Sequence, residues 1–285
     1  MLWKDRRRSE NVEDRRDEVV SRGSKKGVGI IAIIVAVIAM YFGVDPAVVL
    51  QHIPNQQPTT TSSTPRTKSA EEEQLAAFIS VVLADTEDTW NKIFQEMGKT
   101  YQEPTLVLFS GAVQSACGFA DAAVGPFYCP ADKKAYIDLS FYHDLKQRFH
   151  SPGDFAQAYV IAHEIGHHVQ KLLGISDKVH AASAKLSEVE ANKLSVKLEL
   201  QADCFAGIWA NHTDKTKRIL ENGDMEEALN AASNIGDDRL QKQARGQITP
   251  DSFTHGTSEQ RMRWFKRGFD SGNINQCNTM NAQNL

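Results

Sequence analysis

The sequence is short of several features that define large classes of protein. Its 285 residues carry 32 Lys and Arg against 36 Asp and Glu, so no global basic excess is available for nucleic-acid binding. Only four cysteines are present, and none stands in the C-x-x-C spacing that closes many structural zinc sites. No internal repeat is visible. The content of 41% hydrophobic and 24% charged residues is close to globular averages and excludes a wholly disordered chain.

Charge is missing altogether from the 18 residues 27–44. As a helix, this run would be about 27 Å long, enough to cross the core of a bilayer. Arg22, Lys25 and Lys26 stand just before it, so the positive-inside rule predicts a single-pass signal anchor with a cytoplasmic N-terminus. A cleaved signal peptide fits less well, because a long polar segment precedes the run and no clear A-x-A site is present. A buried core helix would usually show a polar face.

The remaining organisation follows from composition. Residues 1–26 hold nine Lys or Arg and six Asp or Glu, and are expected to be a charged, solvated tail in the cytoplasm. Residues 45–70 are rich in Thr, Ser, Gln and Pro and are expected to be a flexible linker. The folded domain is then 71–285, on the extracytoplasmic side of the membrane. The lipid bilayer is the expected partner of 27–44.

Within this domain, apolar spacing predicts mostly helices and a small sheet, an α+β fold. The expected helices cover 71–98, 155–173, 183–209, 224–234 and 257–269, and short β-prone runs cover 105–109 and 135–139. Gly174 is expected to end the second helix, and Thr257 with Gln260 forms a capping box at the start of the fifth.

The second helix contains His163, Glu164 and His167 in the spacing HExxH. At about 100° per residue, the two histidines lie about 40° apart on one face, one turn from each other. Both imidazoles can therefore reach one zinc ion at about 2.0–2.1 Å. Glu164 lies beside the first ligand, where its carboxylate can accept a proton from metal-bound water.

A catalytic zinc site needs a third protein ligand. A histidine six residues after His167 is excluded, because Leu173 stands there. Glu199 on the third helix is the better candidate, and Asp203 one turn later can accept the second ring N–H of a ligating histidine. Glu188 and Glu190 on the same helix are weaker alternatives, since no carboxylate follows four residues after either of them.

HExxH followed by ExxxD is similar to the pattern of gluzincin metallopeptidases. More narrowly, the chain resembles the bacterial putative neutral zinc metallopeptidase family of membrane-anchored proteins. The resemblance is carried by RRS (7–9), NVEDRR (11–16), GPFYCP (125–130), AHEIGHH (162–168), ELQADCFAGIWA (199–210) and THGTSEQR (254–261). It implies a zincin-like fold and peptide hydrolysis, with His163, His167 and Glu199 as ligands of one Zn²⁺ and Glu164 as the catalytic residue.

Several further side chains are candidates for supporting roles. His255 lies in a loop before the fifth helix and is the best candidate to stabilise an oxyanion, although a loop histidine bonded to the backbone is an equal alternative. Tyr159 and Tyr136 are weaker candidates, because aromatic residues at such positions are more often core. His168 points about 100° away from His167 and is expected to be structural.

The cysteines fit an exported domain. Cys117 and Cys129 enclose a short loop, and Cys204 would then pair with Cys277; four cysteines permit three connectivities, so the other pairings stay open.

The sequence thus predicts a zinc-dependent peptidase that acts on peptide or protein substrates. The alternative is a zinc-binding scaffold of the cell envelope that does not cleave. Glu164 favours the enzyme, because a structural site would have a fourth ligand and no need of a base.

Overall fold

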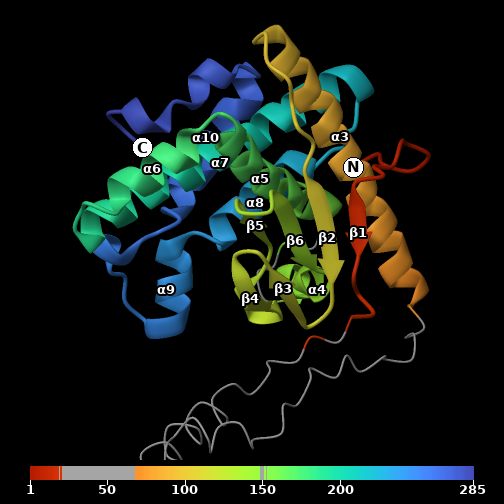
Figure 1. Cartoon of the computed structure of the whole chain (residues 1–285), viewed down its shortest axis with the longest axis horizontal. Helices are drawn as coiled ribbons and strands as arrows, with labels where there is room; N and C mark the ends of the chain where they lie inside the picture. The colour runs from red at the N-terminus through yellow and green to blue at the C-terminus, as the bar shows by residue number, and fades with distance from the viewer. Residues whose placement is uncertain (19, 21–67, 148–150, 152) are drawn as a thin grey trace, which may run out of the picture. The chain divides into compact units, whose positions relative to one another are not determined.

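The computed structural model describes residues 1–18, 20, 68–147, 151 and 153–285 (Figure 1). Eight α-helices are present in this part of the chain, together with a small sheet. Their bounds are α3 Ala70–Glu96, α4 Ser140–Gln147, α5 Asp154–Leu172, α6 Ile175–Ser183, α7 Glu188–Lys217, α8 Asp224–Asn234, α9 Asp237–Arg245 and α10 Ser258–Ser271. The predicted mostly helical α+β class is confirmed.

The strands are β1 Val12–Asp14, β2 Thr105–Phe109, β3 Ala112–Ser115, β4 Gly118–Asp121, β5 Phe127–Cys129 and β6 Lys134–Asp138. Four of them form one sheet in the order β1-β2-β6-β5, in which β1, β2 and β6 are parallel and β5 is antiparallel to β6. β3 and β4 form a separate hairpin. Short 3₁₀ turns complete the fold: η1 Ala122–Val124, η2 Pro250–Ser252, η3 Ile274–Cys277 and η4 Thr279–Asn281.

The core lies between the helices and the central strands. β2 and β6 carry apolar residues on both faces, as strands of a covered parallel sheet usually do. One face of β2, with Leu106 and Leu108, packs into the main core, to which α3, α5 and α7 also contribute. The apolar stripe of α5, with Ile161 and Ile165, is fully buried there. This packing leaves the histidine face of α5 directed at α7.

The predicted solvated tail is wrong for residues 1–16. Met1–Arg16 belongs to the same compact unit as the helices, and β1 is the outermost strand of its sheet. Composition indicated a solvated segment, but β1 pairs with the otherwise open edge of β2, and Arg16, only 4% exposed, pairs with Asp14 and Glu73. The domain therefore includes residues 1–16 besides the predicted 71–285.

The other predictions for the N-terminal region lie largely outside the described residues. This applies to the run 27–44 and to the linker up to residue 67. Of the described linker residues, Ser69 is the N-cap of α3, in a capping box with Glu72. Within the ranges that the structure describes, none of the helices combines the length and apolarity that a bilayer span requires.

Helix ends agree with the local sequence signals. Thr257 and Gln260 form the predicted capping box of α10, and Gly174 follows α5 with a left-handed φ of 69°. The third predicted helix, α7, starts later than the predicted 183–209 because Ser187 caps it in a box with Glu190. It also ends later, at Lys217, before Arg218 in the left-handed conformation. The cysteines pair as Cys117–Cys129 and Cys204–Cys277, the connectivity expected from the sequence.

Helices α7 and α10 approach each other through glycines. A Cβ on Gly207 would lie 2.1 Å from the backbone oxygen of Phe265, and one on Gly268 would lie 1.9 Å from the backbone oxygen of Cys204. Backbone atoms cannot rotate away from such a contact, so only glycine allows this spacing. The close approach brings Arg261 of α10 to Asp203 of α7.

We predict that Gly268→Ala forces these two helices apart. Overpacking of this kind costs about 1–3 kcal/mol of unfolding free energy. Chemical denaturation of the purified domain measures the loss, with Ser271→Ala on the exposed side of α10 as the control. A loss for Gly268→Ala no larger than that of the control would contradict the close approach.

Candidate metal centre

Three side chains from two helices meet at one point. His163 and His167 of α5 have their ring centroids 4.8 Å apart, and both turn Nε2 toward Glu199 of α7. His163 Nε2 lies 3.2 Å from Glu199 Oε2, and His167 Nε2 lies 3.4 Å from Glu199 Oε1. One ligand atom from each of the three residues lies within 4.8 Å of the others, a spacing that could hold a metal ion.

The spacing suits zinc. With ligands at about 2.0–2.1 Å in a tetrahedral site, neighbouring ligand atoms are about 3.3–3.4 Å apart. The two nitrogen–oxygen distances, 3.2 and 3.4 Å, are close to this value although they go to different oxygens of Glu199. Two imidazoles with one carboxylate are a ligand set that zinc prefers. Of the three carboxylates considered from the sequence, Glu199 is the one that meets both histidines; Glu190 instead caps the start of α7.

A glycine between the histidines makes the meeting possible. A Cβ on Gly166 would lie 3.0 Å from both Cα and the backbone oxygen of Ala202, which stands between Glu199 and Asp203. α7 can therefore pack closely against the middle of the HExxH turn. The HExxH turn thus supplies two histidines to the site, and its glycine lets α7, which carries Glu199, approach them.

The second ring nitrogen of each histidine has its own partner. His163 Nδ1 is 2.8 Å from Asp203 Oδ1, and His167 Nδ1 is 3.0 Å from Gln170 Oε1. Because a carboxylate accepts, the Nδ1–H of His163 donates to it. The amide of Gln170 is oriented in turn, since its Nε2 donates to the backbone oxygen of Leu198 at 2.7 Å. Both imidazoles are therefore held with Nε2 facing the site.

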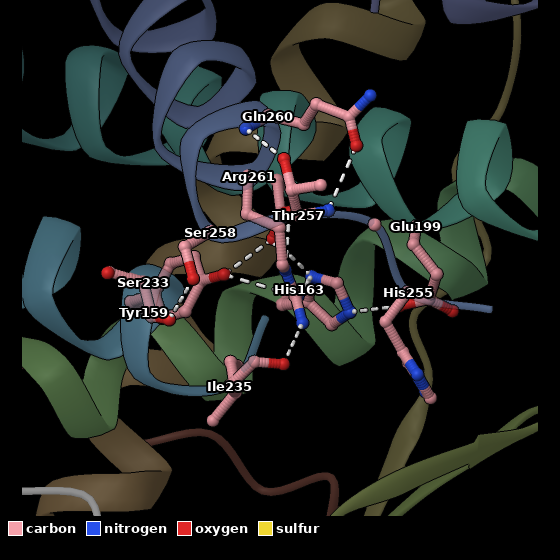
Figure 2. A network of polar contacts seen from close by, with 12 residues as sticks. Tyr159, His163, Glu199, Ser233, Ile235, His255, Thr257, Ser258, Gln260 and Arg261 are labelled. Carbon is pink, nitrogen blue, oxygen red and sulfur yellow. Dashed lines mark hydrogen bonds and ion pairs between the residues drawn. The ribbon is translucent and has the colours of Figure 1, made fainter. Parts of the chain in front are cut away.

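Asp203 is the centre of a buried polar network. Figure 2 labels three of its partners, Tyr159, His163 and Arg261. Arg261 of α10 donates to it through Nε at 2.9 Å and Nη2 at 3.0 Å, and the Tyr159 hydroxyl donates at 2.5 Å. Arg261 also donates to the backbone oxygen of Ile235 at 3.5 Å. A bidentate pair of this kind fixes both oxygens of the carboxylate, and with them the orientation of His163.

The electrostatics of the site keep its carboxylates ionised. Burial alone would raise the pKa of Asp203, but the charges of Arg261 and His163 outweigh it and lower this pKa to about 2. For Glu199, burial is likewise outweighed by His167 and His163, and its pKa falls well below the usual range. A cation in this site would therefore be attracted by two ionised carboxylates, Glu199 and Asp203. Arg261 balances the charge of Asp203.

Glu164 shares the cleft with these three side chains. It is 8% exposed and lies on the wall of a cleft of about 660 Å³ with His163, His167 and Glu199. No other described residue forms a hydrogen bond or an ion pair with its carboxylate. Its oxygens are thus free to act on a molecule in the cleft.

His255 lies on the same cleft, before α10. Its Nδ1 is 3.2 Å from Asp237 Oδ1, while Asp237 Oδ2 accepts the backbone N–H groups of Thr254, His255 and Gly256. One carboxylate therefore fixes both the loop and the ring. The hydrogen bond to Asp237 raises the pKa of His255 above its usual value, against the opposing effect of burial.

The other aromatic candidates have structural partners. The Tyr159 hydroxyl donates to Asp203, and the Tyr136 hydroxyl donates to Asp132 at 2.7 Å, so neither offers its proton to the cleft. His168 is fully buried, and its Nε2 lies 2.6 Å from the backbone oxygen of Gln102, in keeping with the predicted structural role. Burial lowers the pKa of His168 to about 4.

Three residues of the site were not singled out from the sequence: Gln170, Asp237 and Arg261. Gln170 stands three residues after His167 on the same face of α5, a signal that helical spacing contains. Asp237 and Arg261 lie 18 and 58 residues from their partners His255 and Asp203, and no local period connects them.

Comparison with known proteins shows the family to which the chain belongs. A family model described as putative neutral zinc metallopeptidase matches residues 1–280, so the chain belongs to this family. Its sequence is 54% identical to the uncharacterized protein YpfJ of Escherichia coli K12 over 288 residues, 98% of both chains. It is 38% identical to the uncharacterized protein Rv2575 of Mycobacterium tuberculosis H37Rv over 266 residues, 87% of this chain and 86% of the relative. No solved structure matches significantly.

Proposed function

We propose that this chain is a zinc-dependent peptidase with a zincin-like fold and the ligand set of gluzincins. His163, His167 and Glu199 would hold one zinc ion, with Asp203 orienting His163 and Glu164 as general base. The observation that supports the proposal is the convergence of these three side chains on a cleft wall where none of the other described residues forms a hydrogen bond or an ion pair with the carboxylate of Glu164.

The zinc ion and the side chains of the site would have separate roles in peptide hydrolysis. Zinc with three protein ligands and one open position acts as a Lewis acid toward a carbonyl group and lowers the pKa of water. Glu164 accepts a proton from the attacking water and then delivers it to the amine that leaves. His255, held by Asp237, donates a hydrogen bond to the carbonyl oxygen as negative charge develops there.

The cleft supports a peptide as substrate. Gly125, Pro126, Phe127 and Tyr128, at and before β5, form part of its wall. β5 is an edge strand of the described sheet, because only β6 pairs with it. An extended peptide can add to such an edge through main-chain hydrogen bonds, which suits a substrate of varied sequence.

The compartment proposed for this activity lies outside the cytoplasm. Two disulfides support it, because such bonds persist in oxidising compartments. The apolar run 27–44 would bring the domain to the bacterial inner membrane. The partners are then a peptide or protein substrate and the lipid surface.

We predict that hydrolysis depends on one zinc ion per chain. Removal of metal by a chelator should abolish release of fragments from fluorescently labelled casein, and stoichiometric Zn²⁺ should restore it. Elemental analysis before and after dialysis gives the metal content, and Mg²⁺ in place of Zn²⁺ is the control. Metal-loaded protein that cleaves neither casein nor a peptide library would overturn the proposal.

We also predict that the decrease of kcat/KM at high pH reflects the deprotonation of His255. The pKa of His255 is raised above its usual value. His255 is therefore fully protonated, and able to donate, at low pH, and it loses this proton as the pH rises through its pKa. Asp237→Asn removes the charge that raises the pKa, and the alkaline limb of kcat/KM should move toward lower pH. Asp251→Asn, an exposed position, is the control. If the alkaline limb of kcat/KM stays at the same pH in Asp237→Asn, His255 does not take part in the mechanism.

A further inference from the structure

The N-terminal segment is built into the domain by its main chain. β1 pairs in parallel with β2 in the register Val12 with Leu106 to Asp14 with Leu108. The ladder extends beyond the strand, because the amide of Leu106 donates to the oxygen of Asn11 at 2.8 Å. In Figure 1, β1 lies directly beside β2, next to α3.

Buried carboxylates of α3 depend on the same segment. Glu87 is 1% exposed, and its hydrogen-bond donors are Arg7, Ser9 and Asn11. Asp85, also 1% exposed, is paired with Arg6 and with Lys217 of α7. Burying an ionised carboxylate is costly unless it is paired, so α3 requires residues 6–11 in place.

The chain leaves and re-enters the domain at adjacent points. Lys68 Nζ lies 2.8 Å from Asp14 Oδ2. Arg16 donates to the backbone oxygen of Glu72 at 3.3 Å and pairs with Glu73 at 2.9 Å, both in the first turn of α3. The end of β1 and the start of α3 are thus fastened to each other.

These contacts restrict how the chain can meet a membrane. Strands that exchange hydrogen bonds cannot be separated by a hydrocarbon core of about 30 Å. Between Arg16 and Lys68 the sequence has a single uncharged apolar run, 27–44. One crossing there would leave β1 and β2 on opposite sides of the bilayer.

We propose that residues 1–16 lie on the same side of the bilayer as the metal site, so that the chain between Arg16 and Lys68 makes no net crossing. This replaces the single-pass topology with a cytoplasmic N-terminus that charge distribution predicts. The inference does not depend on peptidase activity.

Cysteine labelling of the full-length protein in a bacterial host tests the proposal. Lys4→Cys and, separately, Lys242→Cys place one thiol at exposed positions in the N-terminal segment and in α9; the four native cysteines are disulfide-bonded. A membrane-impermeant maleimide is added to spheroplasts before and after detergent. Equal labelling at both positions before detergent is expected. Labelling at position 4 that requires detergent, while position 242 does not, would overturn the proposal.

A second measurement keeps the test valid if a cysteine variant folds poorly. A specific protease site is inserted within residues 59–63 and cut in detergent solution. Residues 1–58 should remain bound to the purified domain, and Ser9→Asp, which places a second carboxylate beside Glu87, should release them. Separation of the fragments in the otherwise native chain would show that β1 is not part of the sheet.

Discussion

Glu164→Gln is expected to retain zinc at the level of the native chain and to hydrolyse peptides about 10²- to 10⁴-fold more slowly. Glutamine has nearly the same size and keeps the wall of the cleft intact. Its amide, however, cannot accept and release a proton near neutral pH. The loss should therefore appear in kcat, with KM little changed, because the amide still occupies the same position beside the substrate.

The measurement combines elemental analysis with cleavage of labelled casein. Glu226→Gln, at an exposed position of α8, is the matched control and should behave as the native chain does. Equal activity of Glu164→Gln and the control would assign the proton transfer to another group. A loss of metal together with activity would instead indicate that Glu164 takes part in binding the ion.

The residues that meet at the candidate metal centre could be predicted because their spacing is local. One helical turn fixes the relation of His163 to His167, and another fixes that of Glu199 to Asp203. The remaining step, that the two helices face each other, followed from the chemistry of zinc. The structure agrees, since α5 and α7 meet at Gly166 and Ala202.

The N-terminal segment shows why composition alone wrongly predicted a solvated tail. Residues 1–16 contain many charges and few apolar side chains, which locally indicates a solvated tail. Their place in the fold is decided by partners about 70 to 100 positions away, Glu87 on α3 and the edge of β2. Hydrogen bonds to an open strand edge and to buried carboxylates leave no periodic trace in the sequence.

Short elements were missed for a related reason. α6, α9 and the β3–β4 hairpin have few residues, so neither a helical nor an alternating period can develop over their length. α9 still matters for the site, because Asp237 at its start holds His255. Among the long helices, α3, α5 and α10 were predicted close to their observed bounds, whereas α7 starts and ends later than predicted.

Arg261→Met is expected to lower the unfolding free energy of the domain by about 3–5 kcal/mol, the cost of breaking a buried ion pair by removing one partner. Arg261 is 2% exposed and Asp203 is fully buried, so methionine leaves a buried carboxylate whose remaining partners are His163 and the Tyr159 hydroxyl. Chemical denaturation of the metal-free protein measures this loss. Arg263→Met, whose partner Glu259 is exposed, should cost at most about 0.5 kcal/mol.

The double variant Asp203→Asn/Arg261→Met separates charge from packing. If the loss comes from an unpaired carboxylate, neutralising it should recover a large part of the stability that Arg261→Met removes. Zinc affinity should fall in all variants that alter Asp203 or Arg261, because the orientation of His163 depends on both. Full stability and full zinc affinity of Arg261→Met would mean that the ion pair neither supports the fold nor positions the metal ligand.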